Sequence, residues 1–88
     1  MGWTIRYAAR IRKEVERVDP VTRRRIRRFL EERLAGLEDP RSLGRPLAGG
    51  KDGLWRYRVG PYRIICQLED QNLVVLVLRI GHRRDVYR

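Results

Sequence analysis

The chain has 88 residues and a formal net charge of +10, with 21 basic side chains against 11 acidic ones. This length predicts a single domain over residues 1–88. Apolar residues make up 42%, enough for one compact core, and no apolar run approaches the ~18 residues of a membrane span. A strong positive field attracts anions, so nucleic acids or acidic proteins are the expected partners, and a membrane is not.

The cysteine and histidine content bears on location and cofactors. Cys66 is the one cysteine and His82 the one histidine. A lone cysteine allows neither an internal disulfide nor a multi-cysteine zinc site. The sequence turns charged as early as Arg6, so we expect no secretory signal. We therefore expect a cytoplasmic protein with no metal site and no cofactor.

The first half of the chain predicts one strand and two helices. Apolar residues alternate with polar ones over residues 3–7, which is the period of a half-buried strand. They recur at helical spacing over residues 8–18 and again over residues 20–37. Asp19 is the predicted N-cap of the second helix. That helix has arginines on its polar side, either solvated or docked onto RNA or an acidic partner.

The second half predicts a loop and then three strands. Residues 38–53 contain prolines and glycines, and they match no phosphate-binding loop. Alternation predicts strands over 54–59 and 62–68, and an almost continuous apolar run over 73–80 predicts the central strand. The order β-α-α-β-β-β predicts an α+β fold, in which a small antiparallel sheet has an N-terminal helical hairpin on one face.

Arginines are predicted to gather on the other face of this sheet. A tight turn at residues 60–61 would place Arg58 directly opposite Arg63, with Arg56 on the same face. Like charges directly opposed cost a few tenths to about 1 kcal/mol. A bound phosphate would compensate, because guanidinium groups match its oxygens bidentately. The alternatives are a solvated face and ion pairs with nearby carboxylates.

The end of the chain concentrates reactive groups. His82, Arg83, Arg84 and Tyr87 follow the last predicted strand, so we expect them at the sheet edge, with the imidazole close to the arginines. His82 is the side chain there whose ordinary pKa lies near neutrality. The alternatives are an ordinary surface histidine and a tyrosine that anchors the tail to the core.

Residues 54–67 and 78–87, together with the 47–49 stretch, resemble RelE-type toxins of the RelE/ParE toxin–antitoxin superfamily. The resemblance covers nearly the whole chain. It implies the toxin of a type II module, a ribosome-dependent endoribonuclease that cleaves mRNA in the A site when a ribose 2′-OH attacks the adjacent phosphate. It also implies a hetero-oligomer with an acidic, amphipathic, RelB-like antitoxin.

The resemblance also implies which residues form the catalytic and RNA-binding site. The expected catalytic residues are Arg58, Arg63, His82, Arg83 and Tyr87, and the expected RNA-binding residues are Lys51, Arg56 and Arg84. The archetypal toxin has lysine at positions 56 and 58. Since arginine stays protonated, acid–base chemistry would pass to His82, to Tyr87 or to the ribosome. We assign it to His82, with Tyr87 positioning or stacking on a base.

Two other functions fit the same pattern. A ParE-like protein would share the fold but inhibit DNA gyrase and would carry out no RNA chemistry. A non-catalytic module would bind RNA or the ribosome through its basic faces alone.

Overall fold

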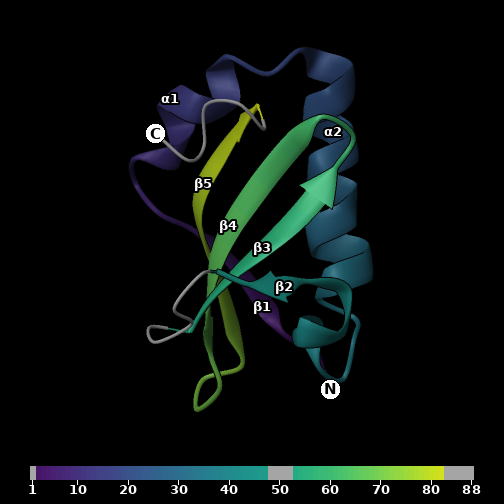
Figure 1. The fold of residues 1–88 in the computed structure, drawn as a ribbon, viewed down its shortest axis with the longest axis vertical. Helices are drawn as coiled ribbons and strands as arrows, with labels where there is room; N and C mark the ends of the chain where they lie inside the picture. The colour runs from purple at the N-terminus through teal and green to yellow at the C-terminus, as the bar shows by residue number, and fades with distance from the viewer. Residues whose placement is uncertain (1, 48–52, 83–88) are drawn as a thin grey trace.

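The computed structural model describes residues 2–47 and 53–82. They form a five-stranded sheet with strand order β1-β5-β4-β3-β2, and two α-helices (Figure 1). The elements in chain order are β1 (Thr4–Tyr7), α1 (Ile11–Glu16), α2 (Pro20–Arg28), β2 (Arg45–Pro46), β3 (Leu54–Val59), β4 (Tyr62–Glu69) and β5 (Val74–His82). The α+β class and the predicted order of the main elements are confirmed.

The sheet is mixed, so the prediction of a wholly antiparallel sheet was wrong. β1 runs parallel to β5, with Tyr7 opposite Val77, whereas the other neighbouring strands are antiparallel. Alternation reveals a strand but not its partner, and helices rather than a hairpin join β1 to the rest. β4 rather than β5 is the central strand.

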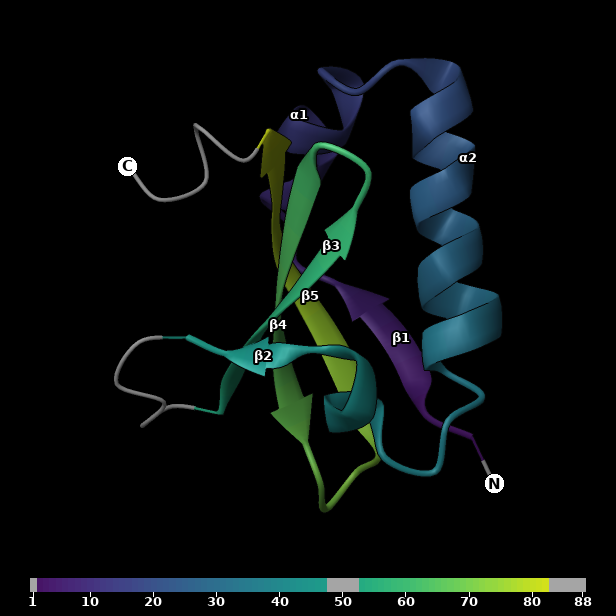
Figure 2. The ribbon, with the colours of Figure 1, turned by 45° about the vertical axis from the view of Figure 1, so that its right-hand side comes forward.

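Both helices lie on one side of the sheet, as Figures 1 and 2 show from two directions. The side chain of Asp19 caps α2 as predicted, because its Oδ2 accepts a bond of 2.9 Å from the amide of Thr22. The helix continues as a π-helical segment over Phe29–Leu34, where the amide of Ala35 donates to the carbonyl of Leu30 at 3.0 Å. In the part of the chain that the structure describes, no helix is long and apolar enough to cross a membrane.

The core fills the space between the helices and the sheet. Its most deeply buried side chains are Leu30, Leu34, Tyr57, Ile64, Cys66, Val75 and Val77. The rings of Tyr57 and Phe29 pack 6.1 Å apart, which joins β3 to the second helix. The Tyr57 hydroxyl also donates to the carbonyl of Pro40 at 3.0 Å. One side chain therefore fixes three parts of the fold.

The predicted loop before β3 holds two short elements instead. A 3-10 helix covers Pro40–Leu43, and β2 then pairs with β3. Arg41 holds this segment in place with bonds of 3.0 and 2.6 Å to the carboxylate of Asp70, and its guanidinium lies 5.7 Å from the centre of the Trp55 ring. Neither element is long enough to give a periodic pattern in the sequence.

Leu73, in the turn before β5, has a left-handed backbone with φ +52°. An L-residue with a bulky side chain pays about 1–2 kcal/mol for this conformation, which asparagine tolerates better. We expect Leu73→Asn to raise the free energy of unfolding by several tenths to about 1 kcal/mol in urea denaturation. Gln71→Asn in the same turn is the matched control and should change it by less than about 0.3 kcal/mol. Equal effects of the two substitutions would refute the explanation by backbone strain.

Candidate nucleic-acid interface

The β3–β4 hairpin places arginines opposite each other, as predicted. Arg58 pairs with Arg63, and Arg56 pairs with Ile65 in the next row of the same face. The neighbouring rows put Tyr57 opposite Ile64, and both side chains are buried on the helix side. Since successive side chains of a strand alternate between faces, the arginines lie on the side of the sheet that faces away from the helices.

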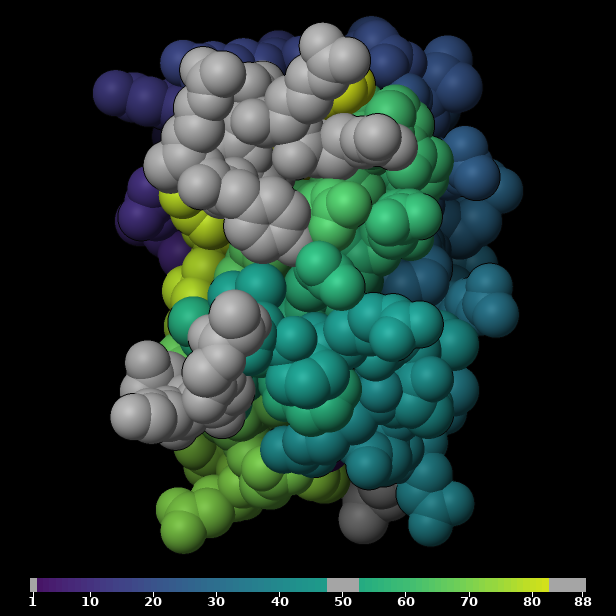
Figure 3. Space-filling model, in the orientation of Figure 1, coloured from purple at the N-terminus to yellow at the C-terminus, as the bar shows by residue number. Residues whose placement is uncertain are grey.

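Two further arginines join these rows. β2 places Arg45 opposite Arg56, and β5 places Arg79 opposite Ile65. We call the set Arg45, Arg56, Arg58, Arg63 and Arg79 the arginine face; Figure 3 views the molecule from this side. The sequence did not reveal Arg45 because β2 was read as loop. Nor did it reveal Arg79, because a shift in register between Ile65 and Cys66 changes the strand pairing.

Helix α1 holds the β5 end of the arginine face. The Glu14 carboxylate accepts a bond of 3.0 Å from Nε of Arg79 and one of 2.7 Å from the amide of Ile80. The pairing of β1 with β5 ends at Tyr7, so this amide lies on a part of the strand edge that β1 does not reach. Glu14 supplies the acceptor there and fixes the Arg79 guanidinium.

The imidazole of His82 does not lie on the arginine face, so the expectation that it would was wrong. β5 extends two residues beyond the predicted strand, which places Gly81 opposite Arg63 and His82 opposite Tyr62. Since successive side chains of a strand alternate between faces, His82 falls on the helix side. Its ring meets that of Tyr62 edge-on, with centroids 5.9 Å apart.

Four of the residues predicted for the site lie outside the described residues. They are Lys51, Arg83, Arg84 and Tyr87. The structure therefore brings together Arg56, Arg58 and Arg63 from the predicted set and separates His82 from them.

The described residues offer charge rather than a nucleophile or a metal centre. No group of three or more potential metal-ligating side chains occurs among them. Cys66 is fully buried, and this burial raises the pKa of its thiol well above the usual range, so it stays protonated. Guanidinium groups on a sheet can hold a phosphate and offset its developing charge, but they cannot transfer protons.

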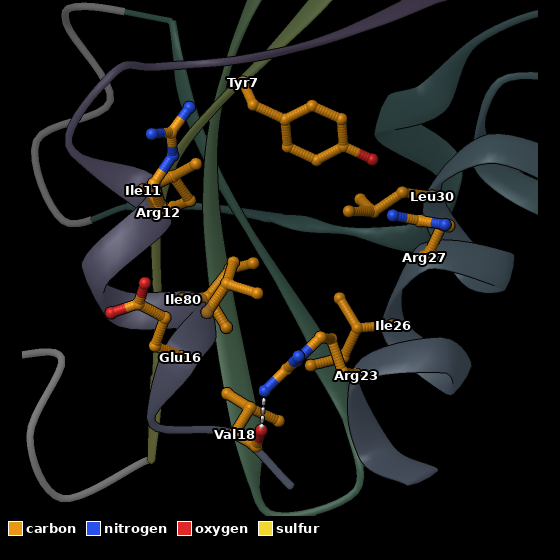
Figure 4. A pocket seen from close by; sticks show the side chains of 11 residues that line it. Tyr7, Ile11, Arg12, Glu16, Val18, Arg23, Ile26, Arg27, Leu30 and Ile80 are labelled. Carbon is orange, nitrogen blue, oxygen red and sulfur yellow. Dashed lines mark hydrogen bonds between the residues drawn. The ribbon is translucent and has the colours of Figure 1, made fainter. Parts of the chain in front are cut away.

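An apolar groove lies between the two helices on the opposite side of the sheet (Figure 4). Its volume is about 580 Å³, and Ile11, Val15, Ile26, Leu30 and Ile80 form its apolar lining. We call it the helical groove. Its rim is largely basic, with Arg12, Arg23 and Arg27 around it and one carboxylate, Glu16.

Tyr7 stands in the helical groove and bridges to the second helix. Its hydroxyl donates to Oε2 of Glu31 at 2.6 Å. Burial, with the bond to Glu31 and its negative charge, raises the pKa of the phenol well above its usual range. Tyr7 therefore acts as a neutral hydrogen-bond donor that joins β1 to the helix.

Comparison with known proteins places the chain in a family. Residues 5–87 match the family model described as the ParE toxin of the type II toxin–antitoxin system parDE. Toxin RelG of Mycobacterium tuberculosis is 28% identical over 88 residues, which cover 100% of this chain and 99% of that protein.

Solved structures agree with this placement. The RelBE2 toxin–antitoxin complex of M. tuberculosis matches with a TM-score of 0.83 and 26% identity, over 97% of this chain and 95% of that one. The intact RelBE complex of Escherichia coli matches with a TM-score of 0.72 over 91% of this chain and 95% of that one; at 23% identity it supports the fold alone.

The chain belongs to the ParE toxin family of type II toxin–antitoxin systems, within the RelE/ParE superfamily. Among the members of that superfamily, its similarity is to the RelE-type toxins, which confirms the family that the sequence resembled.

The pairing of Arg58 with Arg63 is expected to lower the stability of the fold, and this expectation can be tested. Arg58→Glu would replace the repulsion with Arg63 by a cross-strand attraction, so we expect the free energy of unfolding to rise by about 0.5 kcal/mol. The same change should abolish phosphate binding on this face. Arg24→Glu, at an exposed position on α2, is the control for the loss of net charge. Equal stabilisation by both variants, measured in urea, would show that the pairing of Arg58 with Arg63 is not the cause.

Proposed function

We propose that this protein is a ribosome-dependent endoribonuclease of the cytoplasm, which cleaves mRNA in the A site and is neutralised by a cognate RelB-like antitoxin. The observation that carries the proposal is the arginine face, above all Arg58 held directly opposite Arg63 on the side without helices. A rigid sheet that holds like charges together is suited to a ligand with concentrated negative charge.

The chemistry is an internal transfer of the phosphate. The ribose 2′-OH attacks the adjacent phosphorus, the bond from phosphorus to the 5′-oxygen breaks, and the products are a 2′,3′-cyclic phosphate and a free 5′-OH. Negative charge builds up on the phosphate oxygens as the transition state forms. Fixed donors on Arg58 and Arg63 stabilise that charge where it develops.

Proton transfer requires a different group. Arginine stays protonated, and the register places His82 on the opposite side of the sheet from Arg63. We therefore move the acid–base role from His82 to Tyr87 or to the ribosome. Arg83 contributes a further positive charge in this proposal, and Lys51, Arg56 and Arg84 bind RNA. These assignments follow the resemblance to RelE-type toxins.

The helical groove is suited to the antitoxin. An amphipathic helix could lay its apolar side against Val15 and Ile26, while acidic side chains on its flanks meet Arg12 and Arg27. This charge pattern is complementary to a protein with a net charge of +10. The RelBE2 structure of M. tuberculosis and the archaeal RelE–RelB structure are themselves toxin–antitoxin complexes.

Cleavage by purified protein on programmed ribosomes tests the proposed reaction, with cut sites mapped by primer extension. We expect Arg63→Ala to lower the single-turnover rate by about 10²–10³, the usual cost of removing one donor that stabilises transition-state charge. His82→Ala should stay within about threefold of the wild type, because its ring lies on the other side of the sheet. A large loss with His82→Ala would restore the acid–base role to the imidazole.

The same assay separates the competing functions. The matching family model is named for ParE, so inhibition of DNA gyrase is the second candidate. Inhibition of supercoiling by the wild type, without mRNA cleavage, would establish that candidate and refute ours. Ribosome binding with neither activity would indicate a non-catalytic module.

Charge reversal on the rim tests the helical groove. We expect Arg12→Glu with Arg27→Glu to weaken binding of the cognate RelB-like antitoxin by at least about tenfold, because repulsion replaces attraction at both flanks. Arg10→Glu with Arg24→Glu makes the same charge change at exposed positions outside the groove. Titration calorimetry that shows equal losses for the two double variants would refute this docking site.

A further inference from the structure

A second basic surface lies where the second helix meets the tip of the β3–β4 hairpin. A hollow of about 500 Å³ opens there, and the residues around it include Arg25, Arg28, Arg33, Arg58, Phe29 and Glu32. We call it the α2 hollow. Arg25 reaches the hairpin, because its Nη1 lies 3.5 Å from the position that a Cβ would take on Gly60.

The α2 hollow has a rigid frame. Phe29 packs on Tyr57, and the buried side chain of Val59 lies at its β3 side. The three helix arginines lie at intervals of three and five residues along α2 and the π-helical segment that continues it, and all three border the hollow. The helix thus fixes the spacing of these charges.

These charges are poorly balanced within the protein. Four guanidinium groups surround the hollow against a single carboxylate, that of Glu32. Among the described residues, the ion pairs within 4.0 Å involve Arg27, Arg41 and Arg79, and none of the four arginines of the hollow. All four are exposed and thus accessible to a ligand.

The hollow differs from the helical groove in what it can bind. The groove is lined mainly by aliphatic side chains with three arginines around it, which suits an amphipathic protein helix. In the hollow, Val59 is buried and Phe29 is half-buried, and four exposed arginines lie around them against a single carboxylate. A polyanion with regularly spaced charges matches this surface better than an apolar helix face does.

We infer that the α2 hollow binds the phosphodiester backbone of a structured RNA, at a site separate from the phosphate that is cleaved. This inference rests on the proposed function and deepens it. Arg58 belongs both to the hollow and to the arginine face, so the two surfaces meet at the end of β3. The arginine face acts on the substrate strand, and the hollow anchors the toxin on RNA that stays intact.

The test removes the helix charges and leaves Arg58 in place. The variant R25Q/R28Q/R33Q is compared with R10Q/K13Q/R17Q, which removes three positive charges from exposed positions in and around α1. Thermal unfolding checks that both fold. The probe is a fluorescein-labelled RNA hairpin with a stem of about 16 base pairs, and Kd is measured by anisotropy between about 50 and 200 mM salt.

We expect the α2 variant to lower the slope of log Kd against log salt by about 2–3 and to weaken binding by at least about tenfold, whereas the α1 variant changes the slope by less than about 1. On programmed ribosomes, the α2 variant should raise the apparent KM for ribosomes and leave kcat unchanged. Equal slopes for the two variants would overturn the inference. So would unchanged RNA binding together with weaker antitoxin binding, which would assign the hollow to the protein partner.

These outcomes are independent of the proposed reaction. A wild-type protein that cleaves no mRNA counts against the endoribonuclease, whatever the hairpin slopes are. A wild-type protein that cleaves normally, with hairpin slopes that do not distinguish the two variants, counts against the hollow alone.

Discussion

The register of the β3–β4 hairpin is the constraint on which the rest of the molecule depends. The turn requires Gly60, whose φ of +57° suits a residue without a side chain, and the pairing of Val59 with Tyr62 follows directly from it. Successive rows then alternate: Tyr57 and Ile64 face the helices, and Arg58 and Arg63 face away from them. A slip of β3 by one residue would turn Arg58 toward the core and Tyr57 away from it. The core thereby enforces a cationic surface that electrostatics alone would oppose.

The separation of two sheet faces gives this small domain two kinds of binding surface. The side with the helices offers an apolar groove, which suits a protein partner. The other side offers guanidinium groups, which suit phosphate. In the function proposed above, the antitoxin occupies the helical groove and the substrate strand lies on the arginine face, so the antitoxin would prevent entry into the ribosome by its bulk.

The sequence was informative wherever a local pattern determined the structure. Alternation defined β3 and β4, and the short turn between them gave the pairing of Arg58 with Arg63. The N-cap at Asp19 could be predicted for the same reason, because it depends only on neighbouring residues. The direction of β1 could not be predicted, because two helices separate this strand from its partner β5. The place of His82 depended on where β5 ends, and Gly81, which follows the predicted strand over 73–80, is in fact part of β5.

Glu14 covers part of the exposed edge of the sheet. The edge of β5 beyond β1 would present unpaired amides, and exposed strand edges are templates for pairing with another chain. The carboxylate occupies the Ile80 amide and so blocks that template. A single glutamate on a short helix thus covers part of the strand edge that β1 leaves open.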